Sequence, residues 1–360
     1  MIQSHLKTLV VTVALSAGAI PAVAHHSGAM FDDKKEVTLT GVVKEFQYTN
    51  PHSWLLVDAG NPGPRDADRI AATAKEAGVR QIDYLLITHF HGDHFGSVPD
   101  LATRLPIRNF VDYGSTLETS ERALAGAKEY TSVRDKGRHL LAKPGDTVPI
   151  RGLDVQIVIA GGAAITRALP GGGAPNPLCR DFTPNVGNAA AAEDSRSVGI
   201  VVRHGQFRTI NLGDLTWNKE FDLVCPNNLL GTMDLYFTNH HAIPGAVSPA
   251  LVYALKPRIA VFDNGATKGA SREPFLTIKN SPGLEDMWQL HYSVPRPARP
   301  NFGETTDQGG KDLNAPDEFI ANLQEEHSTA YALKISAWED GSFAVTNQRT
   351  GSTKDYKSRR

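Results

Sequence analysis

The chain has 360 residues, of which 21% are charged and 41% hydrophobic, and its formal net charge is -2. These values are ordinary for a globular protein, and the length allows one large domain or two modest ones. Because its charges nearly balance, the chain lacks the basic footprint that nucleic-acid-binding proteins usually carry. The composition therefore shows no clear nucleic-acid footprint.

Residues 1–24 have the pattern of a secretory signal peptide. Lys7 supplies the positive start, residues 9–19 form the apolar centre, and Ala22-Val23-Ala24 is a small-x-small cleavage site. The apolar run is too short to span a bilayer well, and no other segment approaches about 18 uninterrupted apolar residues. We expect an exported protein, periplasmic or secreted, with no membrane span after signal removal.

The chain has two cysteines, Cys179 and Cys225. In an oxidising compartment they can form a disulfide, which would close a loop of about 46 residues. The alternative is two unrelated buried thiols. Neither lies in a CxxC motif, the spacing typical of redox and zinc sites.

Residue patterns along the chain predict alternating helices and strands. Apolar residues at helical spacing before Gly78 indicate a helix over 64–77, and alternation over 153–159 indicates a strand. We also expect helices at 101–105, 117–130 and 315–325 and from 248 onward, and strands at 82–87, 110–111, 197–203, 207–212, 234–239, 288–293 and 337–346. This order predicts a layered α/β fold.

Residues 161–195 interrupt this alternation with runs of Gly, Pro and Ala. A loop of this length in a compact domain is usually functional or mobile. It can lie beside the functional site as a flap that shapes substrate binding, or it can be a plain surface insertion.

Four potential metal ligands follow the apolar strand that ends at Thr88. They fall within six positions, and they are His89, His91, Asp93 and His94. In α/β folds, ligands bind at the carboxyl ends of strands, and imidazole with carboxylate suits zinc, manganese or iron. The alternative is a solvated loop whose histidines are satisfied by neighbouring backbone.

This H-x-H-x-D-H pattern resembles the signature of the metallo-β-lactamase superfamily. The resemblance implies a four-layer αβ/βα sandwich with metals at one edge. The Gly-Asp-Leu sequence around Asp214 matches the superfamily's bridging carboxylate, although such an aspartate could instead cap a helix. In the strand that follows, His241 would complete the second metal, with His240 as an outer partner or an alternate ligand.

The resemblance also assigns roles. His89 and His91 would hold the first metal, Asp93, His94 and His241 the second, and Asp214 would bridge them and, with Asp93, act in catalysis. The cofactor would be zinc at two sites, or manganese, and would activate a hydroxide. Asp58 would orient a ligand, and Lys268 and His291 are candidates for contacts with a ligand or with substrate.

The chain departs from most of the superfamily at one ligand. A further histidine is expected after the strand at 153–159, but Ala160-Gly161-Gly162 stands there. Asp194 or Ser197 could help to fill the gap, and the first metal site is expected to be only partly occupied. The ComEC-type branch, named for competence proteins, also lacks this histidine, and it has His-His-Gly-Ser where this chain has His240-His241-Ala242-Ile243.

The ComEC-type resemblance implies hydrolysis of a phosphodiester or related ester, with a small-molecule or nucleotide-like substrate. A β-lactamase or lactonase is the enzymatic alternative. The non-enzymatic alternative is a hybrid or degenerate protein that binds metal without turnover.

The start of the mature chain differs from the superfamily. His25-His26-Ser27 and the segment 49–54 resemble a family of small exported bacterial β-domains of unknown function. We therefore expect a signal peptide at 1–24 and a borrowed β segment at 25–57 that supplies the N-terminal strands. The hydrolase domain would span 58–350, followed by a solvated basic tail at 351–360.

Overall fold

The computed structural model describes residues 37–41, 46–50, 53–183, 192–300, 303–325 and 330–359, with side chains from Leu55 onward. The chain divides into two units, Met1–Glu36 and Val37–Arg360, of which only the second contains described residues. The predicted signal peptide and the His25-His26-Ser27 sequence lie outside the described residues.

The first sheet has nine strands in the order β20-β19-β18-β1-β2-β3-β4-β5-β6. β1 pairs antiparallel with β18, and β3 pairs parallel with β4. The strands before residue 58 are therefore hydrogen-bonded to strands that follow it, within one sheet. The strands are β1 (Val37–Gly41), β2 (Phe46–Asn50), β3 (Ser53–Val57), β4 (Ile82–Leu86), β5 (Ile107–Asp112), β6 (Arg138–Leu141), β18 (Leu333–Ala337), β19 (Phe343–Asn347) and β20 (Thr353–Tyr356).

The second sheet runs in the order β17-β16-β15-β14-β12-β11-β8-β7, and β9 pairs with β8 beside this path. Its strands are β7 (Thr147–Val148), β8 (Asp154–Ala160), β9 (Ala163–Ala164), β11 (Gly199–His204), β12 (Phe207–Asn211), β14 (Leu235–Phe237), β15 (Ile259–Phe262), β16 (Asp286–His291) and β17 (Ile320–Asn322). A separate pair joins β10 (Ala174–Pro175) to β13 (Asn227–Asn228).

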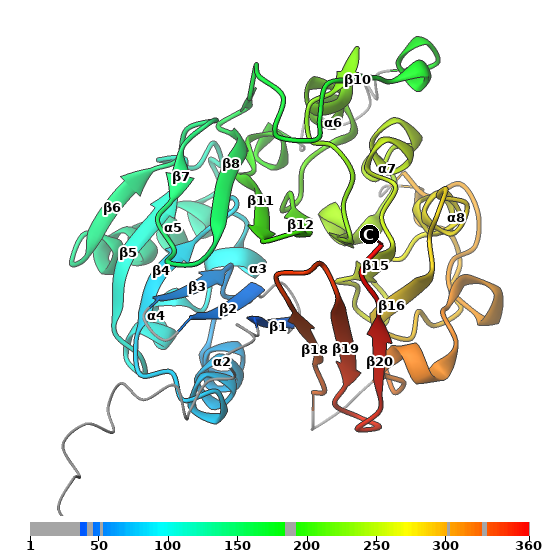
Figure 1. Cartoon of the computed structure of the whole chain (residues 1–360). Coiled ribbons are helices and arrows are strands. Elements are labelled where there is room, and N and C mark those ends of the chain that lie inside the picture. The colour runs from blue at the N-terminus through cyan, green and yellow to red at the C-terminus, as the bar shows by residue number, and fades with distance from the viewer. Residues whose placement is uncertain are drawn as a thin grey trace, which may run out of the picture. The chain divides into compact units, whose positions relative to one another are not determined.

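Helices lie along both sheets (Figure 1). Beside the first sheet are α2 (Pro64–Glu76), α4 (Val98–Ala102) and α5 (Glu121–Arg134), and beside the second are α6 (Trp217–Val224), α7 (Pro249–Leu255) and α8 (Arg272–Lys279). The predicted α/β fold with four layers is confirmed. None of the described helices is long and apolar enough to cross a membrane.

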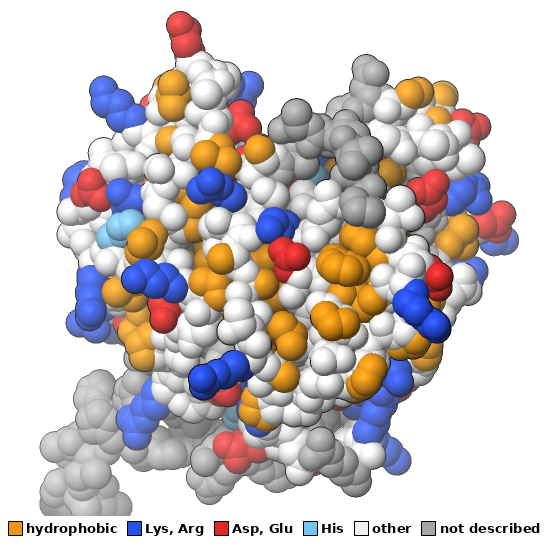
Figure 2. Space-filling view, turned by 90° about the horizontal axis from the view of Figure 1, so that it is seen from above, with side chains coloured by type: hydrophobic (Ala, Val, Ile, Leu, Met, Phe, Trp, Pro, Cys, Tyr) orange, Lys and Arg blue, Asp and Glu red, His pale blue; other side chains and the backbone are white. Residues whose placement is uncertain are grey.

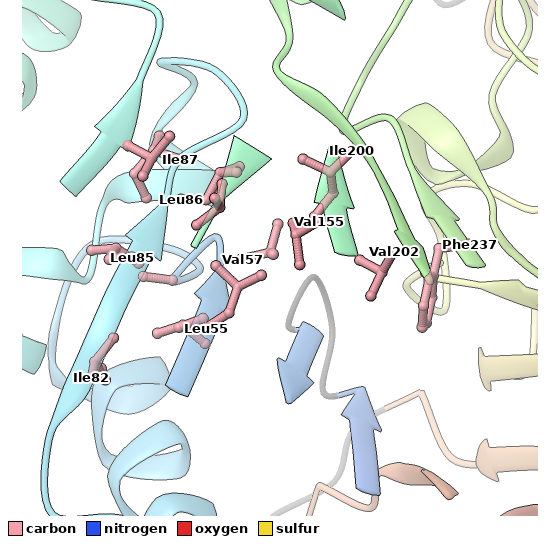
Figure 3. Packing of buried hydrophobic residues seen from close by; sticks show 14 of the residues in the cluster. Leu55, Val57, Ile82, Leu85, Leu86, Ile87, Val155, Ile200, Val202 and Phe237 are labelled. Atoms are coloured by element: carbon pink, nitrogen blue, oxygen red, sulfur yellow. The ribbon is translucent and has the colours of Figure 1, made fainter. Parts of the chain in front are cut away.

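The central core lies between the two sheets. Leu55, Val57 and Leu85 of the first sheet and Val155 and Ile200 of the second belong to one buried cluster (Figure 3). Side chains along a strand alternate between the two faces of the sheet. The side chains of the second sheet that point away from the central core therefore form a separate buried cluster with α6, α7 and α8. The second sheet is therefore covered on both faces.

The face shown in Figure 2 carries basic and acidic side chains interspersed among apolar ones. Among the described residues visible there, neither sign of charge forms a continuous area. This face therefore does not present a broad basic surface.

The predicted helix at 315–325 is wrong. This segment forms a short turn at Asp317–Phe319 and then β17, which pairs parallel with β16. The side-chain amide of Asn347 donates to the carbonyls of Glu318 and Ile320, so tertiary partners satisfy backbone groups that a helix would bond internally.

Part of the predicted solvated tail at 351–360, the segment Thr353–Tyr356, belongs to the first sheet, although only Tyr356 of these four residues is buried. These residues form β20, which pairs antiparallel with β19. Tyr356 is 2% exposed and stacks on Phe343 with ring centroids 4.6 Å apart. Burial of this aromatic ring stabilises the packing of the segment on the sheet.

Candidate metal centre

The candidate ligands come from four segments that meet at one edge of the sandwich. The turn after β4 carries the H-x-H-x-D-H sequence, β12 leads to Asp214, β14 leads to His240 and His241, and a 3-10 turn carries Asp194. Their ligand atoms form four overlapping groups, which are His89-His91-Asp194, His89-His94-Asp214, Asp93-His94-His241 and Asp194-Asp214-His240.

Asp194 completes the group around the first two histidines. Its Oδ1 lies 2.8 Å from Nδ1 of His91 and 3.4 Å from Nε2 of His89. The two ring nitrogens themselves lie 3.0 Å apart. Asp194 thus lies beside His89 and His91, the two histidines for whose metal site the sequence showed one ligand missing.

Asp214 lies at the centre of the second group. Its Oδ2 is 3.2 Å from Nε2 of His94 and 3.4 Å from Nε2 of His241. Asp93 approaches the same two histidines, with carboxylate oxygens 3.7 Å from each Nε2. Since Oδ2 of Asp214 is also 3.9 Å from Nε2 of His89, this carboxylate links the two halves of the site.

His240 and His241 serve different halves of the site although they are adjacent in sequence. Nε2 of His240 lies 3.7 Å from both Asp194 Oδ2 and Asp214 Oδ2, whereas His241 faces Asp93 and Asp214. The structure thus brings both histidines to the ligand groups, where they share Asp214 and differ in their second carboxylate, Asp194 for His240 and Asp93 for His241.

An unusual backbone turn separates these two rings. His240, His241 and Ala242 have φ values of 49°, 54° and 56°, in the left-handed region that costs non-glycine residues about 1–2 kcal/mol each. The turn is held by the hydrogen bond from His240 N–H to Gly213 O and by that from Ala270 N–H to His241 O. Gly269 allows this approach, because a Cβ there would collide with His241.

Outer partners fix the orientation of the histidine rings. Asp58 Oδ2 lies 2.9 Å from Nδ1 of His94, and Thr88 donates its N–H and its hydroxyl to the same carboxylate. Nδ1 of His241 lies 3.1 Å from the carbonyl of Asp263. These contacts leave the Nε2 atoms directed at Asp214, which is the arrangement expected of metal-binding histidines.

Three further residues lie at the site, and no sequence motif marks them. Glu118 Oε1 lies 3.5 Å from Nε2 of His91, so the other ring nitrogen of His91 faces Asp194. Asp263 supports His241, and Glu193 is a buried carboxylate directly before Asp194. All three lie in loops without a motif, although the acidic pair Glu193-Asp194 just before an apolar strand could have drawn attention.

The remaining candidates lie at different places. Nζ of Lys268 is 2.9 Å from Oδ2 of Asp93, which puts a cation next to the ligand groups. His291 is buried outside these groups, and its carbonyl accepts a hydrogen bond from the Asn264 side chain.

Cys179 and Cys225 form a disulfide with Cα atoms 5.6 Å apart.

Burial and neighbouring charges set the protonation of the site. Burial, together with nearby His94, lowers the pKa of His89 to about 4, so this ring is neutral at pH 7. Burial alone would lower the pKa of His91, but the hydrogen bond and charge of Asp194 raise it to about 9. The pKa of Asp194 is lowered despite its burial, because His89 and His91 donate to it.

The donor set fits divalent metal ions. Ring nitrogens and carboxylate oxygens approach each other within 4.8 Å in every group, and most of these side chains are buried. Two buried carboxylates surrounded by imidazoles, with two ring nitrogens facing each other at 3.0 Å, suit a bound cation better than hydrogen bonding among themselves. The residues present can therefore hold metal.

A family model described as "Family of unknown function (DUF6152)" matches residues 13–80. The match covers the region where the sequence resembled a small β-domain family, and its description names no activity. It ends before the H-x-H-x-D-H sequence and therefore does not include the candidate metal ligands of that turn.

Two curated proteins and one solved structure illustrate the similarity to known proteins. "Lactamase-like protein nscB" of Neosartorya fischeri is 28% identical over 163 residues, 45% of this chain and 42% of the relative. "Atrochrysone carboxyl ACP thioesterase" of Aspergillus terreus is 38% identical over 52 residues, 14% of this chain and 16% of the relative. The alignments thus span less than half of either relative.

The solved structure is "the metallo-beta-lactamase fold protein YhfI from Bacillus subtilis". It is 11% identical, covers 63% of this chain and 83% of its own, and has a TM-score of 0.35. The similarity to proteins named lactamase-like and the H-x-H-x-D-H ligands gathered around Asp214 both support the resemblance of this chain to the metallo-β-lactamase superfamily.

Proposed function

We propose that this protein is a metal-dependent hydrolase that cleaves an ester bond. The observation that carries the proposal is the overlap of four ligand groups, three of which contain Asp194 or Asp214, while the fourth shares His94 with one of these three. When bound at such a site, divalent ions lower the pKa of water towards neutrality and stabilise negative charge that develops on the substrate.

The two halves of the site would hold separate metal ions. His89, His91 and Asp194 would hold one, with His240 beside them, and Asp93, His94 and His241 the other, with Asp214 between. Because most of the donors are imidazoles, we propose zinc, with manganese as the alternative.

Our first choice of substrate is a phosphodiester or a related ester. The likeness of the His240-His241 segment to the ComEC-type branch supports this choice, as does the histidine after residue 159 that both lack. Lys268 supports it too, since an ammonium group 2.9 Å from Asp93 can bind an anionic substrate oxygen beside the ligands. A carboxylic thioester is the second candidate, favoured by the similarity to a protein named as a thioesterase.

Metal analysis and a substrate panel test the function together. Purified protein is expected to contain up to two equivalents of zinc or manganese and to hydrolyse one of bis(p-nitrophenyl) phosphate, a thioester, a lactone or nitrocefin, with activity lost to a chelator and restored by metal. Asp214→Ala should remove at least one equivalent. The matched control is Asp312→Ala, an exposed aspartate outside the ligand groups.

Each outcome of this experiment has a definite meaning. Metal content unaffected by Asp214→Ala would remove Asp214 from the site. Bound metal without turnover of any member of the panel would favour a protein that binds metal without catalysis. Hydrolysis of nitrocefin or the lactone alone would identify the β-lactamase or lactonase alternative.

We also propose that the protein is exported. The pattern of residues 1–24 supports this, and the Cys179–Cys225 disulfide supports it independently, because such bonds persist mainly in oxidising compartments. Expression in a bacterial host with fractionation should yield periplasmic or secreted protein whose N-terminal sequence begins at His25. Cytoplasmic protein that retains residues 1–24 would contradict export.

A further inference from the structure

A cavity of about 570 Å³ lies directly beside the candidate metal ligands. Its volume falls in the range of about 300–1,000 Å³ typical of small-molecule sites. His91 and Asp93, one from each half of the metal site, form part of its wall. A substrate whose ester group reaches these ligands can therefore extend a second part of itself into the cavity.

Much of the apolar part of the wall comes from the loop after β3 and from two helices. Pro62 follows β3, Phe95 belongs to the short helix α3 (Gly92–Phe95), and Ala123 and Gly126 lie one turn apart on α5 (Figure 1). Proline, phenyl and small side chains give this part of the wall an apolar surface, while Asn61, Ser120 and the charged side chains form a separate polar part. The apolar part favours a hydrocarbon group over a polar one.

The charged residues of the wall are mostly acidic. Glu118, Glu129 and Asp93 contribute carboxylates, against the guanidinium of Arg122 and the imidazole of His91. An anionic group entering the cavity would therefore meet a net negative surface, whereas an uncharged group would not. Lys268 is absent from the wall, so its positive charge faces the ligand groups from elsewhere.

We propose that this cavity binds an uncharged, apolar arm of the ester substrate, such as an alkyl or acyl chain. The inference rests on the proposed hydrolase function and narrows its substrate class. Esters with a hydrocarbon arm are favoured over those whose second arm is itself anionic, such as a nucleoside polyphosphate. Gly126 is the residue that leaves room for the arm on α5.

Gly126→Leu tests the proposal by filling the cavity. A Cβ at this position would stand 3.4 Å from the Phe95 ring, an ordinary contact, and leucine stabilises helices relative to glycine, so the fold should tolerate the change. Lys128→Leu is the matched control, because it adds leucine to the same helix at an exposed position outside the cavity wall.

Binding is measured first, by titration calorimetry of the metal-loaded protein with octan-1-ol. Gly126→Leu should weaken binding at least about tenfold, while Lys128→Leu should match the wild type. The anion 8-hydroxyoctanoate should bind the wild type more weakly than octan-1-ol. Equal affinity of all three proteins for octan-1-ol, or tighter binding of the anion, would overturn the proposal.

Turnover is measured next, with methyl and octyl members of the ester class that the panel identifies. Wild type and Lys128→Leu should prefer the octyl member in kcat/KM, and Gly126→Leu should lower the octyl-to-methyl ratio at least about tenfold. An unchanged ratio would overturn the proposal. If no ester is hydrolysed but octan-1-ol binding still depends on Gly126, the hydrolase proposal fails and the apolar site stands.

Discussion

Glu193 accepts a hydrogen bond of 2.8 Å from the backbone N–H of Phe90, which lies 103 residues earlier in the chain. The same buried carboxylate accepts hydrogen bonds from the hydroxyls of Tyr113 and Thr116 and from the N–H of Leu117. Glu193 thereby fixes Asp194 against the turn that carries His89 and His91. We interpret it as a positioning residue for the first metal.

Glu193→Gln should therefore lower the metal affinity of the first site by about 10–100-fold. An amide cannot accept four hydrogen bonds, so the free energy of unfolding should also fall by about 1–3 kcal/mol. Chelator competition measures the affinities and urea denaturation the stability. Glu121→Gln, at an exposed position of α5, is the control. Lost stability with both metal affinities intact would reduce Glu193 to a purely structural role.

Asp194 should determine how many metal ions are bound. Asp194→Ala is expected to reduce the metal content by one equivalent, because it removes the carboxylate 2.8 Å from His91 Nδ1. Asp194→His should retain that equivalent, since imidazole is an equally suitable ligand. Elemental analysis of purified protein decides between these results. Full metal content in Asp194→Ala would assign the third ligand to another residue.

The neighbouring histidines should separate the two sites. His240→Ala is expected to weaken the first metal and His241→Ala the second, because their rings face Asp194 and Asp93 respectively. The expected loss is at least about tenfold in each case. Stepwise titration of each variant with cobalt, followed by its visible absorption, reports on the two sites separately. Loss of the same titration step in both variants would contradict the assignment of the two histidines to separate metal sites.

The four candidate ligands of the metal turn could be named from the sequence because they all lie within six positions of one strand end. Asp194 and Glu193 were harder to place, since their roles depend on contacts with His91 and Phe90 that local patterns do not encode. The same reason explains the error at 315–325. There, pairing with β16 and hydrogen bonds from Asn347 decide the structure, and both partners are distant in sequence.

The disulfide should contribute substantially to stability. It closes a loop with a sequence separation of 46 residues, for which the chain-entropy relation gives about 4 kcal/mol. The double variant Cys179→Ser with Cys225→Ser should lose a similar free energy of unfolding in guanidinium denaturation. Alkylation of denatured exported protein, compared by mass before and after reduction, checks the bond itself. Two thiols that react before reduction would contradict it.

A buried ion pair should make stability depend on pH. Arg296 donates to both carboxylate oxygens of Glu304, at 2.6 and 2.5 Å, and Arg299 N–H donates to the same group. Burial would raise the pKa of Glu304, but these donors outweigh it and lower the pKa below its usual value. Arg299 also donates to the carbonyl of Thr267, so the pair supports the loop that carries Lys268.

The sign of the pH effect follows from this lowered pKa. A carboxylate whose pKa is lower in the folded state stabilises the protein above its unfolded pKa of about 4.3, and the gain is lost as the pH falls. Glu304→Gln should therefore cost about 2 kcal/mol at pH 7 and progressively less below pH 4. Urea denaturation of both proteins between pH 7 and pH 3 measures the difference. A difference that stays constant over this range would show that the charge of Glu304 contributes nothing.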